Sequence, residues 1–251
     1  MPEHVQSLER GIAVIRSFSA DTPRQTLADV SRATGLTRAT SRRLLLTLVD
    51  LGYARTDGKT FELTPSILDL GYSFLASLGI DQIAQPFIEQ LSEDVHESSS
   101  ISVLDDTDIV YVARVPTKRI MNVSIGLGSR FPAYQTSMGR VLLAELDNDA
   151  IISIFERSDR DRRTPRTVTD GASLLEHIER VRADGWALLD QELELGVRSV
   201  AAPVRDAHGC AVAAINVSTL AARTDMRELR RTIVPRLLAA ANDVTDALSR
   251  R

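Results

Sequence analysis

Apolar residues recur at helical spacing in three stretches near the start of the chain. The first predicts a helix over residues 5–18, and the third predicts a helix over residues 38–51. Between them lies a short helix with Thr26 as its N-cap and Asp29 three residues later, which is a capping-box arrangement. Gly35 ends this short helix, since glycine favours the left-handed conformation at helix ends. A turn of only about three or four residues then precedes the third helix.

Two short alternating runs follow the third helix and flank the dipeptide Asp57-Gly58. This dipeptide favours a tight turn between antiparallel strands, so the segment predicts a β-hairpin. The order of elements is therefore helix, short helix, turn, helix and hairpin. That order is typical of a winged helix-turn-helix, a DNA-binding unit that we expect over residues 1–64.

After residue 64 the pattern changes to a mixture of helices and strands. We expect a linker helix within residues 65–80, followed by an effector-binding and oligomerisation domain over residues 81–251. The expected helices are residues 66–77, 81–96, 136–146, 150–157, 173–184 and 225–248. The expected strands are residues 98–104, 109–115, 120–125, 186–190, 199–205 and 211–218, with a charged loop at residues 157–169. This mixture predicts an α+β protein whose second domain is a larger α/β, GAF-like sensor.

Composition excludes several other classes of protein. The chain has no run of 18 apolar residues, and its N-terminus has charges inside the apolar stretch, so we expect no membrane span and no signal peptide. A single cysteine, Cys210, excludes an intrachain disulfide. The histidines lack metal-ligand spacing, so we expect no metal and no cofactor. The expected compartment is the cytoplasm.

Charge is distributed unevenly along the chain. The whole chain has a net charge of −4, but residues 1–64 carry nine Lys/Arg against seven Asp/Glu and are net positive. In a helix-turn-helix, the start of the second helix meets base edges, whereas the wing contacts phosphates. The predicted DNA-binding residues are Thr37, Arg38, Thr40, Ser41 and Arg42 for bases, and Arg43, Arg55, Lys59 and Thr60 for phosphates. The alternative is a solvated basic helix in a protein–protein module, but the complete order of elements favours double-stranded DNA.

Several segments carry a family resemblance. SLERGIAVIRSF and TLADVSRATGLTRATSRRLLLTLVDLGY are similar to the DNA-binding domain of the IclR-type bacterial transcriptional regulators, and GWALLDQELELGVRSVAAPV is similar to their sensor domain. The resemblance covers essentially the whole chain. RIMNVSIGLGSRFPAYQTSMGRVLLAEL resembles one subgroup, which controls catabolism of protocatechuate, 4-hydroxybenzoate and related acids through the β-ketoadipate pathway.

The resemblance implies a homodimer, often assembled into a dimer of dimers, and an effector pocket in the C-terminal domain. It implies a small carboxylic acid as effector. The residues that it places in the pocket are Ser137, Met138, Asp190, Glu192, Val197, Ser199, Asn216 and Ser218.

The residue types in this segment suit a carboxylate. Hydroxyls, amides and arginine donate the hydrogen bonds that a carboxylate needs, so Arg130 is a further candidate, with Tyr134 beside an aromatic ring. Each candidate also has a purely structural interpretation. Ser137 suits a helix cap, Arg130 a surface ion pair, and Met138 the hydrophobic core.

Asp190 and Glu192 also raise the hypothesis of an enzyme, because paired carboxylates serve acid–base chemistry. The sequence shows no second catalytic partner, so we expect no catalytic residues. Three hypotheses remain: a ligand-responsive regulator, a ligand-independent DNA-binding oligomer, and an enzyme fused to a DNA-binding head. The first is favoured.

Overall fold

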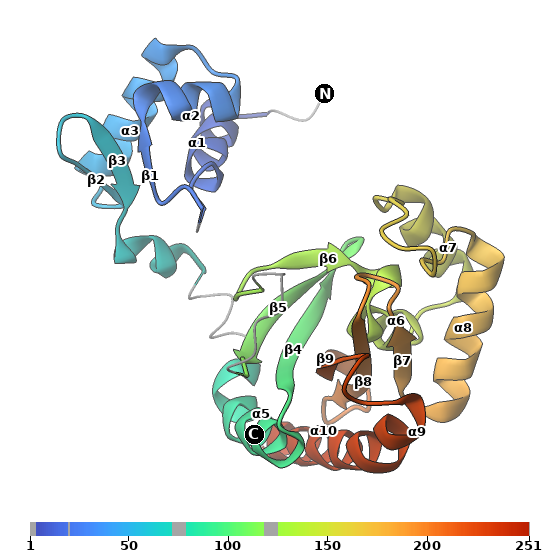
Figure 1. Cartoon of the computed structure of the whole chain (residues 1–251). Coiled ribbons are helices and arrows are strands. Elements are labelled where there is room, and N and C mark those ends of the chain that lie inside the picture. The colour runs from blue at the N-terminus through green and yellow to red at the C-terminus, as the bar shows by residue number, and fades with distance from the viewer. Residues whose placement is uncertain (1–3, 20, 72–78, 118–124, 251) are drawn as a thin grey trace. The chain divides into compact units, whose positions relative to one another are not determined.

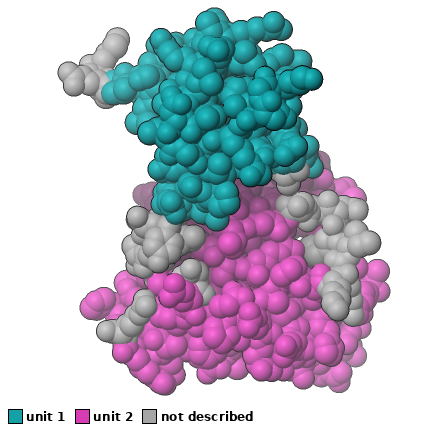
Figure 2. All heavy atoms as spheres, turned by 90° about the vertical axis from the view of Figure 1, so that its left-hand side faces the viewer, with its two compact units in different colours: residues 1–77 teal, residues 78–251 magenta. Residues whose placement is uncertain are grey.

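The structure is a computed structural model that describes residues 4–19, 21–71, 79–117 and 125–250. The chain divides into two compact units, residues 1–77 and 78–251, which Figure 2 distinguishes by colour.

The N-terminal unit is a winged helix-turn-helix (Figure 1). Its helices are α1 (Gln6–Arg16), α2 (Leu27–Thr34) and α3 (Arg38–Asp50). Its strands are β1 (Arg24–Thr26), β2 (Ala54–Thr56) and β3 (Thr60–Leu63), in the antiparallel order β1-β3-β2. The predicted helices and wing hairpin are confirmed. The short β1 was not predicted, because it acquires its strand character by pairing with β3.

Local signals fix the ends of α2 and the position of the core. The Thr26 hydroxyl accepts from the Asp29 backbone N–H at 3.3 Å, and the Asp29 carboxylate accepts from the Thr26 N–H at 3.0 Å, so the predicted capping box is present. Gly35 ends α2 with a φ of 68°. The helices bury Val14, Val30, Leu45 and Leu48 against the sheet residues Ala54 and Phe61.

The C-terminal unit consists of several helices packed around one sheet. The strands of this sheet lie in the spatial order β6-β5-β4-β9-β8-β7. Its strands are β4 (Ser98–Asp105), β5 (Asp108–Val115), β6 (Arg130–Pro132), β7 (Ala187–Asp190), β8 (Val197–Arg205) and β9 (Ala211–Leu220). Its main helices are α5 (Ile80–Val95), α6 (Ser137–Leu143), α7 (Asn148–Arg157), α8 (Gly171–Asp184) and α10 (Val234–Ser249). Helices α5 and α10 pack together against the sheet, and α6 packs on β8 and β9 with α8 outside it (Figure 1).

This architecture agrees with the predicted α+β class but differs in detail. The expected helix over residues 225–248 is divided into α9 (Met226–Glu228), a π-helical turn η3 (Leu229–Ile233) and α10. The short strand β6 was not predicted. Residues 120–124 of the predicted strand and residues 72–77 of the predicted linker helix lie outside the described residues, although Pro65–Leu68 form the 3-10 helix η1. In the part of the chain that the structure describes, no helix combines the length and apolar character needed to cross a membrane.

Candidate functional site

Helix α3 directs its arginines to solvent. Thr37 caps the helix, and its hydroxyl oxygen accepts from the Thr40 backbone N–H at 3.3 Å. Arg38 and Arg42 lie one helical turn apart, so they share an exposed face, and Arg43 is exposed beside them. Within the described residues none of these arginines has a carboxylate partner, so their guanidinium groups are free to bind an anion.

Ser41 does not belong to this face. The residue is completely buried and lies on the inward side of α3 with Leu45 and Leu48, at the i, i+4 and i+7 positions. The prediction that Ser41 contacts a base is therefore wrong in this structure, because the helical period places it in the core.

The wing is held by its turn. The Asp57 carboxylate accepts from the backbone N–H groups of Lys59 at 2.9 Å and Thr60 at 2.7 Å, and from the Thr60 hydroxyl at 3.0 Å. The backbone hydrogen bonds from Thr60 and then Lys59 favour the charged form, so they lower the pKa of Asp57 to about 2. Lys59 is thereby fixed at the exposed tip.

Arg55 is already engaged at the base of the wing. Its guanidinium pairs with Glu62, which also pairs with Arg24 at 2.6 Å. The hydrogen bonds from Arg24 and then Arg55 lower the pKa of Glu62. Arg55 remains exposed, and its contact with phosphate stays a prediction.

A cavity in the C-terminal unit lies between the strands β8 and β9, the start of α6 and the segment after β7. Six of the predicted effector residues line it: Met138, Glu192, Val197, Ser199, Asn216 and Ser218. Sequence reasoning missed the other lining residues, which are Tyr111, Ile125, Gln135, Thr136, Leu189, Leu193 and Glu194. The cavity measures about 40 Å³, which is room for water but less than the roughly 150 Å³ that accommodates benzene.

Several polar side chains lie in the cavity lining. Ser199 and Ser218 are directly paired across β8 and β9, and the Asn216 amide nitrogen donates to the Ser218 hydroxyl at 3.1 Å. The amide oxygens of Gln135 and Asn216 are buried and lack a hydrogen-bond partner in the described structure. A buried polar atom without a partner costs free energy, so these atoms indicate a polar occupant.

Asp190 does not line this cavity, contrary to prediction. Side chains alternate along β7, and Leu189 occupies the cavity side, whereas Asp190 points away and pairs with Arg166 and, at 2.6 Å, with Arg198. The assignment was wrong by one residue, which on a strand means the opposite face.

Arg130 and Tyr134 also lie outside the cavity lining. The Arg130 guanidinium contacts Asp105 at 2.5 Å and Asp108 at 3.1 Å, so the predicted carboxylate clamp is instead an ion pair on the β4–β5 hairpin. Tyr134 is fully buried, and its ring meets Phe155 edge-on at 5.0 Å. Its bulk fills the hydrophobic core.

Ser137 begins α6 but is neither a cavity residue nor the helix cap. The cap is Thr136, whose hydroxyl oxygen accepts from the Gly139 N–H at 3.0 Å. Ser137 is buried, and its hydroxyl has no partner among the described groups. Gly139 is required here, because a Cβ atom at this position would overlap the backbone of Ala133.

Arg140 forms a buried charged network behind the cavity, and sequence reasoning missed it. Its guanidinium donates to both oxygens of Glu192, at 3.0 and 2.5 Å, and to the Tyr134 carbonyl at 3.0 Å. Arg140 is 2% exposed and Glu192 is 8% exposed. Because Glu192 lines the cavity, Arg140 holds one part of the cavity wall in place.

His177 completes the network as a neutral ring. The Arg140 Nη1 donates to His177 Nδ1 at 3.0 Å, and since arginine has no acceptor, the ring proton lies on Nε2. Burial, and then the positive charge of Arg140, lower the pKa of His177.

The lowered pKa of His177 makes the stability of this unit depend on pH. The unfolded chain takes up the His177 proton near pH 6.5, before the folded chain does, so we expect the free energy of unfolding to fall as the pH decreases below about 6.5. Urea unfolding at about pH 7.5 and about pH 5.5 should show this loss. His177→Gln should reduce the difference between the two pH values, whereas His208→Gln, at an exposed turn, should leave it unchanged. An unchanged difference in His177→Gln would show that other groups cause the loss.

A winged helix-turn-helix with an exposed arginine face, in one chain with a unit whose cavity has polar groups in its lining, defines a transcriptional regulator with a sensor domain. Comparison with protein families gives the same class. Residues 7–58 match the IclR helix-turn-helix domain, and residues 72–246 match the bacterial transcriptional regulator IclR C-terminal domain. The chain belongs to the IclR family. It is therefore a DNA-binding regulator and not an enzyme.

Individual relatives narrow the assignment within the family. The chain is 43% identical to the Pca regulon regulatory protein of Pseudomonas putida, over 98% of this chain and 85% of that protein. A crystal structure of a regulator from Rhodococcus sp. RHA1 is 55% identical, with a TM-score of 0.87 over 98% of both chains. The inducer-binding domain of PobR from Acinetobacter, a double mutant solved with 3-hydroxybenzoic acid, is 36% identical, with a TM-score of 0.61 over 65% of this chain and 96% of that one. The chain is thus related to the regulators of aromatic-acid catabolism.

Proposed function

We propose that this protein binds a double-stranded operator as a homodimer, in the cytoplasm, and that a hydroxylated aromatic acid in the sensor cavity changes its affinity for that operator. The observation that carries the proposal is that the cavity lining contains both hydrogen-bond donors and hydrogen-bond acceptors. Ser199, Ser218 and the Asn216 amide supply hydrogen-bond donors for a carboxylate. Glu194 and the unpartnered oxygen of Gln135 supply acceptors for a phenolic hydroxyl.

The apolar part of the lining suits a ring. Tyr111, Met138 and Leu189 line the cavity, and Tyr111 meets Phe131 edge-on at 5.9 Å. Because the cavity is smaller than a benzene ring requires, the ligand must displace side chains as it enters. Met138 is suited to this movement, since its side chain is unbranched and flexible.

A substitution that fills the cavity tests this proposal. Ser199→Leu adds apolar bulk and removes a donor, so we expect the affinity for 4-hydroxybenzoate and protocatechuate to fall at least about tenfold, a loss of about 1.4 kcal/mol. Isothermal titration calorimetry on the full chain measures this affinity. Ser249→Leu, at the exposed end of α10, should bind like the unchanged protein. Equal binding by both variants would place the ligand elsewhere.

The linker and the assembly complete the proposal. We infer that residues 65–80 link a DNA-binding domain, residues 1–64, to the effector-binding and oligomerisation domain, residues 81–251.

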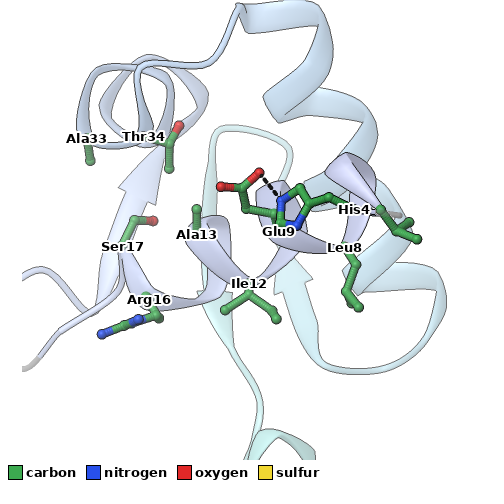
Figure 3. A pocket seen from close by; sticks show the side chains of 10 residues that line it. His4, Leu8, Glu9, Ile12, Ala13, Arg16, Ser17, Ala33 and Thr34 are labelled. Atoms are coloured by element: carbon green, nitrogen blue, oxygen red, sulfur yellow. Dashed lines mark hydrogen bonds and ion pairs between the residues drawn. The ribbon is translucent and has the colours of Figure 1, made fainter. Parts of the chain in front are cut away.

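The exposed face of helix α1 supports the proposal of a homodimer. Val5, just before the helix, and Leu8 and Ile12 on its outer face are 62%, 64% and 47% exposed and line a groove with His4 and Arg16. Figure 3 shows Leu8 and Ile12 in this groove. A contiguous apolar face of this kind is typical of a protein–protein interface.

Charge on the α1 face is expected to break the dimer. A Leu8→Glu, Ile12→Glu double variant would place carboxylates inside an apolar interface, where their burial is unfavourable. Analytical ultracentrifugation should show a shift to smaller species at micromolar concentration. Leu51→Glu, which changes an equally exposed leucine outside α1, should sediment like the unchanged protein. A double variant that keeps the same distribution would show that α1 is not the interface.

A further inference from the structure

A second pocket lies on the outer side of the Arg140–Glu192 pair. Its volume is about 290 Å³, close to the lower end of the range for small-molecule sites. Helix α8 contributes Arg180, β7 contributes Leu188, and the π-helical turn η3 contributes Arg230. Trp186 comes from the bend just before β7. The pocket therefore has an apolar side, formed by Trp186 and Leu188, and arginines from two separate elements.

The carboxylates in the lining are mostly paired already. Glu192 is held by Arg140, and Asp190 is held by Arg166 and Arg198, which leaves Asp184 as the carboxylate outside these pairs in the described lining. The lining therefore holds more arginines than carboxylates, so part of its positive charge is not neutralised.

Arg180 and Arg230 carry this excess charge. The carboxylate of Glu176 lies 3.9 Å from Arg180, but both side chains are largely exposed, and such pairs contribute little. Arg230 has no carboxylate partner among the described residues, and its guanidinium lies 5.8 Å from the centre of the Trp186 ring. A guanidinium beside an aromatic ring keeps donors available for a carboxylate.

We propose that this outer pocket binds a small dicarboxylate. One carboxylate accepts hydrogen bonds from Arg180 and the other from Arg230, while the carbon chain between them packs on Trp186 and Leu188. Glu192 lines both this pocket and the inner cavity, so the two sites share a side chain held by Arg140. This inference concerns a separate site and does not depend on the identity of the inner effector.

Trp186 makes the proposal directly measurable, because it is the single tryptophan of the chain. We would titrate the full chain with succinate, glutarate and adipate, at constant ionic strength, and record tryptophan emission. We expect a saturable change for at least one dicarboxylate, with an affinity at least about tenfold higher than for propionate or inorganic sulfate. Arg180→Gln and Arg230→Gln should each weaken binding about tenfold, whereas Arg236→Gln, an exposed arginine outside this lining, should not.

The remaining outcomes would overturn the proposal. They are the absence of a saturable response to any dicarboxylate, an equal response to sulfate, and an undiminished response in the Arg180→Gln, Arg230→Gln double variant. Ser199→Leu, which fills the inner cavity, should retain the response. A response that is lost in Ser199→Leu but kept in the arginine variants would assign the dicarboxylate to the inner cavity.

Discussion

The Arg38→Ala, Arg42→Ala double variant is expected to lose specific operator binding. Both guanidinium groups are exposed on the first half of α3, the part of a recognition helix that meets base edges, and no described carboxylate neutralises them. An arginine pairing with guanine contributes about 1–3 kcal/mol of discrimination. We therefore expect the affinity for the operator to fall at least about thirtyfold, since even the lower value for each arginine adds to about 2 kcal/mol.

The measurement uses fluorescence anisotropy at a fixed salt concentration, with a duplex selected by the full chain from a random pool. The matched control is Arg231→Ala, Arg236→Ala, which removes the same charge from exposed positions in the C-terminal unit. The control should bind the selected duplex nearly as well as the unchanged protein. If the two double variants lose affinity equally, the effect is one of net charge, and α3 is not the reading element.

Arg140→Met is expected to cause the largest loss of stability. It leaves the Glu192 carboxylate buried without its bidentate partner, and it removes donors from the Tyr134 carbonyl and from His177. Breaking a buried ion pair on one side costs about 3–5 kcal/mol. Urea unfolding followed by the fluorescence of Trp186 reports on the C-terminal unit alone, because Trp186 is the single tryptophan.

Two further variants distinguish the effect of the unpaired buried charge on stability from the effect of lost packing. Adding Glu192→Leu to Arg140→Met removes the unpaired carboxylate, so much of the lost stability should return. Arg130→Met breaks ion pairs with Asp105 and Asp108 that are more exposed, and it should cost no more than about 1 kcal/mol. A loss in Arg140→Met as small as that in Arg130→Met would mean that the buried pair does not support the cavity wall.

Local signals made the DNA-binding unit predictable. The Thr26–Asp29 capping box, the Gly35 terminus and the Asp57-Gly58 turn each involve residues within about one helical turn of one another, so they can be recognised in sequence. The helical period of 3.6 residues also places Ser41 on the buried face of α3 with Leu45. Ser41 was predicted to contact a base because its hydroxyl can form hydrogen bonds, and this prediction ignored the helical period.

The sensor cavity depends on information that a single sequence holds weakly. Leu189, not Asp190, faces the cavity, and on a strand a shift of one residue reverses the face. The Arg140–Glu192 pair joins residues 52 positions apart, and no local pattern indicates that pairing. Ser199 and Ser218 line the cavity, as the family resemblance implied, and their contact with an effector stays a prediction.

The most direct test of whether this protein is a ligand-responsive regulator is to measure its affinity for the operator with and without aromatic acids. We expect 4-hydroxybenzoate or protocatechuate to change the dissociation constant for the selected duplex at least about fivefold, with saturation. Ser199→Leu should abolish this change and still bind the duplex. If no aromatic acid alters the operator affinity, in the unchanged protein and in Ser199→Leu alike, the protein is not a sensor of these acids, and a ligand-independent DNA-binding oligomer is favoured.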